Sequence, residues 1–168
     1  MIDLAKKLRT KLAKGEAIAG PFAKTCDPAF VEVVGRSGFD FIILDGEHGP
    51  QNPYSLQNLI RGAEVSGVCP IVRVDTVGEI ISRVLDIGAA GVQIPQITTR
   101  AEAEAAIAYA KFHPQGERGV CRYVRAANYS SMDKFRYFQE ANENLVILQL
   151  EGQKALQNME EILSVPGI

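Results

Sequence analysis

The segment DGEHGP, at residues 45–50, directly follows a strongly apolar stretch of the chain. It places a carboxylate, Asp45, three residues before an imidazole, His48. Imidazole is the side chain best suited to moving a proton near neutral pH, and a nearby carboxylate can orient it and favour its charged form. Asp and Gly also form ordinary turns, but a turn does not need Glu and His together. We take these residues as candidates for proton transfer, with a simple turn as the alternative.

Three further polar residues stand near the ends of two other apolar stretches. Arg73 lies near the end of residues 70–74, and Gln149 and Glu151 lie near the end of residues 144–151. Residues two apart in a strand share a face, so Gln149 and Glu151 are predicted to point the same way. An acid is costly to bury unless it is paired or bound to a metal. The alternatives are an ion-pair role for Arg73 and a solvent-exposed edge for Gln149 and Glu151.

Together these side chains favour chemistry next to a carbonyl group. Glu151 offers an oxygen ligand suited to a hard divalent cation such as Mg²⁺ or Mn²⁺, which a 2-keto acid can chelate. Arg73 could hold the same substrate oxygens and stabilise a developing enolate, while His48 moves the proton. This is metal-assisted proton abstraction, the core step of a class II aldolase. A Schiff-base aldolase is disfavoured, because no lysine stands in an apolar strand segment.

The periodicity of apolar side chains predicts the elements that must position these residues. Apolar runs predict strands over residues 17–22, 39–44, 70–74, 91–95 and 144–151. Helical spacing and capping residues predict helices over residues 2–13, from 27, from 53, and over 77–88, 99–111 and 132–140, with a last helix outlined by Leu156, Met159 and Leu163. The predicted inward faces carry Leu4, Leu8 and Leu12; Phe30, Val33 and Val34; and Leu56, Leu59, Ile60 and Ala63.

Five strands, each followed by a helix, indicate an α/β fold with a parallel sheet covered by helices. A doubly wound sheet and a (β/α)8 barrel both fit this pattern, and both place the active site at the carboxyl ends of the strands. A complete barrel needs about 200–250 residues, whereas this chain has 168.

The composition narrows the class of protein. The chain is 46% apolar and 23% charged, which is typical of one globular domain, and its formal charge of −2 does not favour nucleic acid or an anionic membrane as partner. No apolar run is long enough to span a membrane, and the N-terminus lacks a signal-peptide core. Three widely spaced cysteines form no metal or disulfide pattern, so a reduced, cytoplasmic setting is predicted.

Three arginines, Arg118, Arg122 and Arg125, cluster in the long connection over residues 112–130. One interpretation is a solvated loop. The other is a lid whose positive charge meets an acidic second substrate.

Several separated motifs resemble those of the HpcH/HpaI aldolases. They are FDFIILDGEHGP, PIVRV, LDIGAAGVQIPQ, FHPQGERGV and VILQLEG, in the order and spacing of that family from about residue 4 onward. The resemblance implies a (β/α)8 TIM barrel in which residues 1–168 form a single, incomplete domain with about the first five to six βα units. It also implies a carbon–carbon lyase that cleaves a 4-hydroxy-2-oxo acid to pyruvate, or a similar 2-keto acid, and an aldehyde. The reaction would pass through a metal-bound enolate with Mg²⁺, Mn²⁺ or Co²⁺, in a homo-oligomer (a hexamer in the family).

The resemblance assigns roles to five residues. His48 resembles the catalytic base, Asp45 its partner, and Arg73 the residue that binds the pyruvate oxygens. Gln149 matches a substrate-contacting glutamine, and Glu151 matches a metal-binding glutamate.

Two features of the resemblance reach beyond these residues. Asp86 sits where the family has an acid near the histidine. A contact across a subunit interface is one way in which the two side chains could meet. The family's second metal-binding carboxylate belongs to a Gly-Pro-x-Asp motif that would follow Ile168. A single protein carboxylate is expected to bind the cation only weakly.

Two other functions stay open on the sequence. The chain could be a non-catalytic truncated barrel that self-associates, because an open barrel exposes sheet edges that invite pairing. It could instead be a citryl-type lyase of the same barrel group that acts on a CoA thioester.

Overall fold

Five parallel strands form one sheet in the computed structural model, which describes residues 2–168. They pair in chain order: β1 (Phe22–Ala23), β2 (Phe41–Asp45), β3 (Cys69–Arg73), β4 (Gly91–Ile97) and β5 (Leu145–Leu150). A doubly wound sheet reverses its strand order at a switch point, whereas a barrel adds each strand beside the last. The observed order therefore follows the barrel pattern and excludes the doubly wound alternative. Within the described residues the sheet is open, with β1 and β5 at its edges.

Helices cover the sheet, and two of them begin at capping residues that the sequence predicts. Asp27 caps one helix, and Thr99 forms a capping box at the start of another. Asn52, which was not predicted as a cap, forms a capping box before Pro53. No helix within residues 2–168 is both long and apolar enough to cross a membrane. The helices are α1 (Ile2–Ala13), α2 (Pro28–Arg36), α3 (Pro53–Ser66), α4 (Glu79–Asp86), α5 (Arg100–Ala110), the 3₁₀ segment η1 (Arg125–Ser130), α6 (Lys134–Ala141), α7 (Gly152–Gln157) and α8 (Met159–Leu163).

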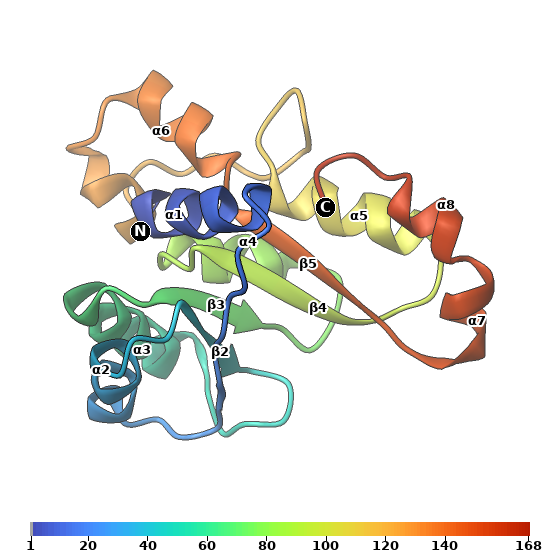
Figure 1. Cartoon of the computed structure of the whole chain (residues 1–168). Coiled ribbons are helices and arrows are strands. Elements are labelled where there is room, and N and C mark those ends of the chain that lie inside the picture. Colours follow the sequence, from blue (N-terminus) through green and yellow to red (C-terminus); the bar gives the residue numbers. More distant parts are fainter. Residues whose placement is uncertain (1) are drawn as a thin grey trace.

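The two faces of the sheet pack against different helices. The main core joins one face, through residues such as Leu44 and Val72, to α2–α5 and α8. The other face carries Ile43 and Ile71 and packs against α1 through Leu8; Figure 1 shows α1 near the starts of β4 and β5. Side chains alternate between faces along a strand. The residues that end β2 and β3, two positions beyond Ile43 and Ile71, therefore share the α1 face.

The first strand is shorter and later than predicted. The prediction placed it over residues 17–22, but β1 is Phe22–Ala23. Pro21 has no N–H group to donate, although its carbonyl oxygen already accepts from the N–H of Ile43 at 2.9 Å. The regular ladder therefore begins only after the proline.

The buried face of α2 is rotated from the predicted one. Val31 and Val34 are buried, whereas Phe30 and Val33 are 41% and 62% exposed, so the prediction was right for Val34 alone. The predicted face starts at Phe30 and the buried face at Val31, so the two faces differ by one residue, or about 100° around the helix. Because both faces carry apolar side chains, periodicity does not tell which one faces the sheet.

The C-terminal helix is two short helices instead of one. The predicted apolar face was wrong, because its residues Leu156, Met159 and Leu163 are exposed. The buried residues are Ala155 and Ile162. Asn158 has a non-helical ψ of 9° between α7 and α8, which breaks the helical phase. Leu12 at the end of α1 is likewise half exposed. By contrast, α3 buries all four of its predicted residues.

Candidate active site

Asp45 and Arg73 form a buried ion pair between the ends of two neighbouring strands. Arg73 Nε donates to Asp45 Oδ1 at 2.9 Å, and Arg73 Nη2 donates to Asp45 Oδ2 at 2.7 Å. The register of β2 and β3 sets these residues opposite each other. Asp45 is 0% exposed and Arg73 is 8% exposed. Two parallel N–H···O bonds fix both the position and the plane of the guanidinium group.

The same carboxylate holds the loop that follows β2. Asp45 Oδ1 accepts from the backbone N–H of Glu47 at 3.2 Å and of His48 at 3.1 Å. The N–H of Gly49 donates to the Asp45 carbonyl oxygen at 3.1 Å. A Cβ at residue 49 would lie 2.3 Å from that oxygen, so the turn requires glycine there. The DGEHGP segment is thus a tight turn that also orders the polar end of β2.

These contacts set the charge of the pair. Burial alone would raise the pKa of Asp45, but hydrogen bonds from Arg73 and from the backbone of His48 and Glu47 outweigh it and hold that pKa below its ordinary value. The hydrogen bond to Asp45 raises the pKa of Arg73, and the charges of Asp45, Glu47 and Glu151 add to the effect. Both groups are therefore ionised near neutral pH.

Glu47 lies between this pair and the exposed ring of His48. Glu47 Oε2 is 3.0 Å from Arg73 Nη1, and Glu47 Oε1 is 3.7 Å from His48 Nε2. The His48 side chain is 61% exposed, while that of Glu47 is 9% exposed. The carboxylate beside the imidazole is that of Glu47, and Asp45 meets His48 through its backbone N–H. A role for Asp45 in orienting the imidazole stays a prediction.

Gln149 and Glu151 form the other half of the site, at the end of β5. Gln149 Nε2 donates to Glu151 Oε1 at 2.9 Å, and the backbone N–H of Gln96 donates to Glu151 Oε2 at 2.9 Å. The β4–β5 register is irregular between Ile94 and Ile97, and Gln96 has a left-handed φ of 57° there. A bulge of this kind turns an amide out of the ladder, and here it faces the Glu151 carboxylate.

Arg73 and Gln93 connect the two halves. The register of β3 and β4 places Arg73 opposite Gln93, and Gln93 Nε2 donates to Gln149 Oε1 at 3.0 Å. The charge of Glu151 is also among those that raise the pKa of Arg73. The site residues predicted from three separate strand ends therefore gather at the carboxyl end of one sheet, as expected for this class of fold.

The described residues do not by themselves fit a metal centre. Glu151 is the carboxylate that they offer at the β5 side, and both of its oxygens already accept hydrogen bonds from this chain. Ca²⁺ and Mg²⁺ take about six or more oxygen ligands. Within residues 2–168, no three His, Cys, Asp or Glu side chains are grouped to hold an ion.

Strand β1 and the residue that follows it add two contacts that the sequence did not reveal. The Phe22 ring lies under the Arg73 guanidinium, 4.9 Å from its centre to Cζ. Lys24 Nζ is 3.8 Å from Asp45 Oδ2. Sequence reasoning also gave no role to Glu47 or Gln93, although Glu47 belongs to the DGEHGP motif and Gln93 interrupts an apolar strand.

The arginine cluster of residues 118–125 is tied to the fold. Arg118 Nη2 donates to Asp86 Oδ1 at 2.7 Å, and its side chain is fully buried over the Phe112 ring. Arg122 donates to the carbonyl oxygens of Ser130 and Met132. Arg125 pairs with Glu64 and donates to the Ile87 carbonyl oxygen. These contacts favour neither a solvated loop nor a free lid, and they give Asp86 a partner other than His48.

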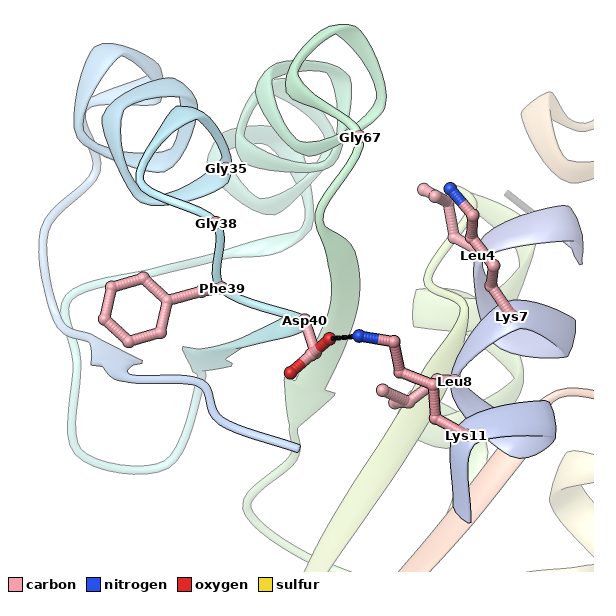
Figure 2. Close-up of a pocket in the computed structure, with 9 residues that line it drawn as sticks. All are labelled: Leu4, Lys7, Leu8, Lys11, Gly35, Gly38, Phe39, Asp40 and Gly67. Atoms are coloured by element: carbon pink, nitrogen blue, oxygen red, sulfur yellow. Dashed lines mark hydrogen bonds and ion pairs between the residues drawn. The ribbon is translucent and has the colours of Figure 1, made fainter. Parts of the chain in front are cut away.

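A separate pocket lies away from these residues. Figure 2 shows it between α1 and the segment that leads into β2, bridged by the Lys11–Asp40 ion pair at 2.5 Å. Its volume is about 250 Å³, and Leu4 and Leu8 line it on the α1 side. Residues that precede β2 stand at the amino end of the sheet, opposite the carboxyl end where parallel α/β sheets place their active sites.

The chain matches the model of the HpcH/HpaI aldolase/citrate lyase family over residues 19–168. It belongs to this family. It is 35% identical over 164 residues to the 5-keto-4-deoxy-D-glucarate aldolase of Escherichia coli (strain K12 / DH10B), a match that covers 96% of this chain and 63% of the relative. The predicted membership of an aldolase and lyase family is confirmed.

Solved structures share the fold of this chain. Citrate synthase SbnG superposes with a TM-score of 0.85 at 32% identity, over 96% of this chain and 62% of that one. An HpcH/HpaI aldolase from Desulfitobacterium hafniense DCB-2 superposes with a TM-score of 0.88 at 29% identity, over 96% of this chain and 63% of that one. The chain thus spans less than two thirds of the length of these relatives.

Proposed function

We propose that this chain carries a carbon–carbon lyase site that cleaves a 4-hydroxy-2-oxo acid to pyruvate, or a similar 2-keto acid, and an aldehyde. The observation that supports it most is the position of Arg73. The guanidinium is held in one plane by Asp45, contacts Glu47 beside the exposed His48 ring, and lies opposite Gln93 on the way to Glu151. A fixed cation next to a proton-transfer group is what an enolate-forming reaction requires. The E. coli relative is named for a keto-deoxy sugar acid.

The reaction itself needs one proton transfer in each direction. A base removes the proton of the C4 hydroxyl, the C3–C4 bond breaks, and the aldehyde leaves. The electron pair of that bond forms an enolate with its negative charge on the C2 oxygen, and a proton then adds to C3 to give the 2-keto acid. We assign the proton transfers to His48, whose imidazole is exposed at this end of the sheet and lies beside Glu47.

The other side chains bind and orient the substrate. Arg73 faces the carboxylate and C2 oxygen of the 2-keto acid, and its pairing with Asp45 prevents the guanidinium from turning away. Gln149 donates an N–H to a substrate oxygen. A divalent cation remains part of the family expectation, but no step here depends on it, because the described residues do not form its site.

An aldol assay tests this function. The chain, with pyruvate, a short aldehyde and Mg²⁺, is expected to form an aldol product. His48→Ala is expected to abolish it, and Glu151→Ala, which removes the acceptor that holds Gln149, is expected to lower it. Gln153→Met, on the exposed surface of α7, serves as the matched control. Equal rates in the wild type and both active-site variants would remove these assignments.

A citryl-type reaction is the second candidate, favoured by the 32% identity to citrate synthase SbnG. That chemistry also uses a stabilised enolate, so the same Arg73 position would serve it. Binding of a CoA thioester without binding of pyruvate, measured by calorimetry, would favour this candidate over the aldolase.

A further inference from the structure

Gln93 is a buried amide in an apolar strand, and the reaction scheme above does not use it. It is 9% exposed and shares the α1 face of the sheet with its register partner Arg73. Buried polar groups in folded proteins almost always have hydrogen-bond partners, and those partners indicate what the group does.

The partners of Gln93 form a short relay. Gln93 Nε2 donates to Gln149 Oε1 at 3.0 Å, and Gln149 Nε2 donates to Glu151 Oε1 at 2.9 Å. The backbone N–H of Gln96 holds the other Glu151 oxygen at 2.9 Å. The relay therefore runs from the middle of β4 to a fixed carboxylate at the end of β5.

The chemistry of the groups sets the direction of this relay. An ionised carboxylate only accepts hydrogen bonds, so Gln149 must turn its NH₂ group toward Glu151 and its carbonyl oxygen toward Gln93. Gln93 must then offer its own NH₂ group. This leaves Gln93 Oε1 as the unused end, and that atom is buried without a hydrogen-bond donor among the described residues. The unpaired atom is the one that this direction predicts.

We propose that Gln93 is a positioning residue that keeps the NH₂ end of Gln149 on the substrate side of the site. An amide NH₂ carries two hydrogens, and Glu151 uses one of them, so the second is available to a ligand oxygen. This half of the site can therefore donate to the keto or carboxylate oxygen of a 2-keto acid, which only accepts hydrogen bonds and which a carbonyl oxygen in the same place could not bind. The identity of the ligand rests on the proposed function, whereas the relay does not.

Two variants separate the relay from simple packing. Gln93→Met keeps the length of the side chain and removes its hydrogen bonds. Gln93→Glu replaces the donor by an acceptor, so Gln149 must turn its NH₂ group toward residue 93 and its carbonyl oxygen toward the substrate. Gln153→Met is the exposed control. Thermal melts of each variant show whether it is folded.

The binding experiment compares pyruvate, whose keto oxygen only accepts hydrogen bonds, with lactate, whose hydroxyl at the same carbon can both donate and accept. We expect the wild type and Gln153→Met to bind pyruvate and to have the same pyruvate-to-lactate ratio of affinities. Gln93→Met should bind pyruvate roughly tenfold more weakly, the loss of about one hydrogen bond, and Gln93→Glu should shift the preference toward lactate. A folded Gln93→Glu variant with an unchanged pyruvate-to-lactate ratio would overturn the proposal.

A second readout does not require ligand binding. The side-chain NH₂ signals of Gln149, assigned by ¹⁵N NMR with Gln149→Leu, should move in Gln93→Met and not in Gln153→Met. If they move while the wild type binds no pyruvate, the relay stands and the proposed function fails. If they do not move in Gln93→Met, the relay itself is contradicted.

Discussion

The two halves of the candidate site use different interactions to hold their acidic groups. At the ends of β2 and β3, Asp45 is fully buried and is held by a charged guanidinium and two backbone N–H groups. At the end of β5, Glu151 is exposed and is held by a neutral side-chain amide and one backbone N–H. The first arrangement is rigid because its alternative is an unpaired buried charge. The second is held by neutral groups at the surface, so losing its charge leaves no buried charge without a partner.

This difference indicates separate roles for the two halves in stability and in ligand binding. The Asp45–Arg73 pair fixes the position of the Arg73 guanidinium and of the loop that carries His48. Its loss should therefore lower stability as well as activity. The Gln149–Glu151 end should matter for ligand binding and little for stability.

The largest effect is expected from Asp45→Asn, which breaks the buried pair and leaves the Arg73 charge without its partner. Loss of one member of a buried pair costs about 3 kcal/mol or more of unfolding free energy. Glu151→Gln removes an exposed charge and should change stability by less than about 0.5 kcal/mol. Urea denaturation of both variants measures the contrast. Similar losses in the two variants would mean that the halves do not differ as described.

Gly49→Ala should produce an intermediate loss. The added Cβ would meet the Asp45 carbonyl oxygen at 2.3 Å and force the DGEHGP turn to open. Overpacking of this kind costs about 1–3 kcal/mol. Gly78→Ala is the matched control, because a Cβ there meets no atom within 4 Å and its φ of 162° is extended backbone. Equal melting temperatures for the two variants would contradict the tight packing of the turn.

A smaller effect is expected from acid. Because the pKa of Asp45 lies below its ordinary value in the folded protein, the unfolded chain binds more protons as the pH falls past about 4. Stability from this group is complete above that pH and is lost as the pH falls through the folded pKa, at up to ~1.4 kcal/mol per pH unit. The difference in unfolding free energy between the wild type and Asp45→Asn should therefore shrink from pH 5 to pH 3. A constant difference would show that the carboxylate is not held in its charged form.

The sequence predicts the elements well where local signals and burial agree. The helix from Pro53 is indicated by that proline and by four apolar residues at helical spacing, and all of these appear as predicted, with an Asn52 cap that the structure adds. The start of α5 follows from the Thr99 capping box. Local signals fail where two faces of a helix are both apolar, as in α2, and where a short break changes the phase, as at Asn158.

The site residues are predictable by position but not by partner. The ends of apolar strands indicated Asp45, Arg73 and Glu151, because parallel strands bring their carboxyl ends together. The pairing of Asp45 with Arg73, and that of Gln93 with Gln149, depends on the register between strands that are 28 and 56 residues apart in sequence. That register follows from the whole sheet, including the bulge at Gln96, and no local pattern encodes it.

The most direct test of the account is the exchange of the pyruvate methyl protons in D₂O, followed by ¹H NMR with the chain and Mg²⁺ at neutral pH. This measures formation of the enolate alone, without an aldehyde. The account predicts exchange above the buffer rate for the wild type and for Gln153→Met, and exchange at the buffer rate for His48→Ala. Exchange that is equally fast in the wild type and in His48→Ala, or absent from the wild type, would contradict it.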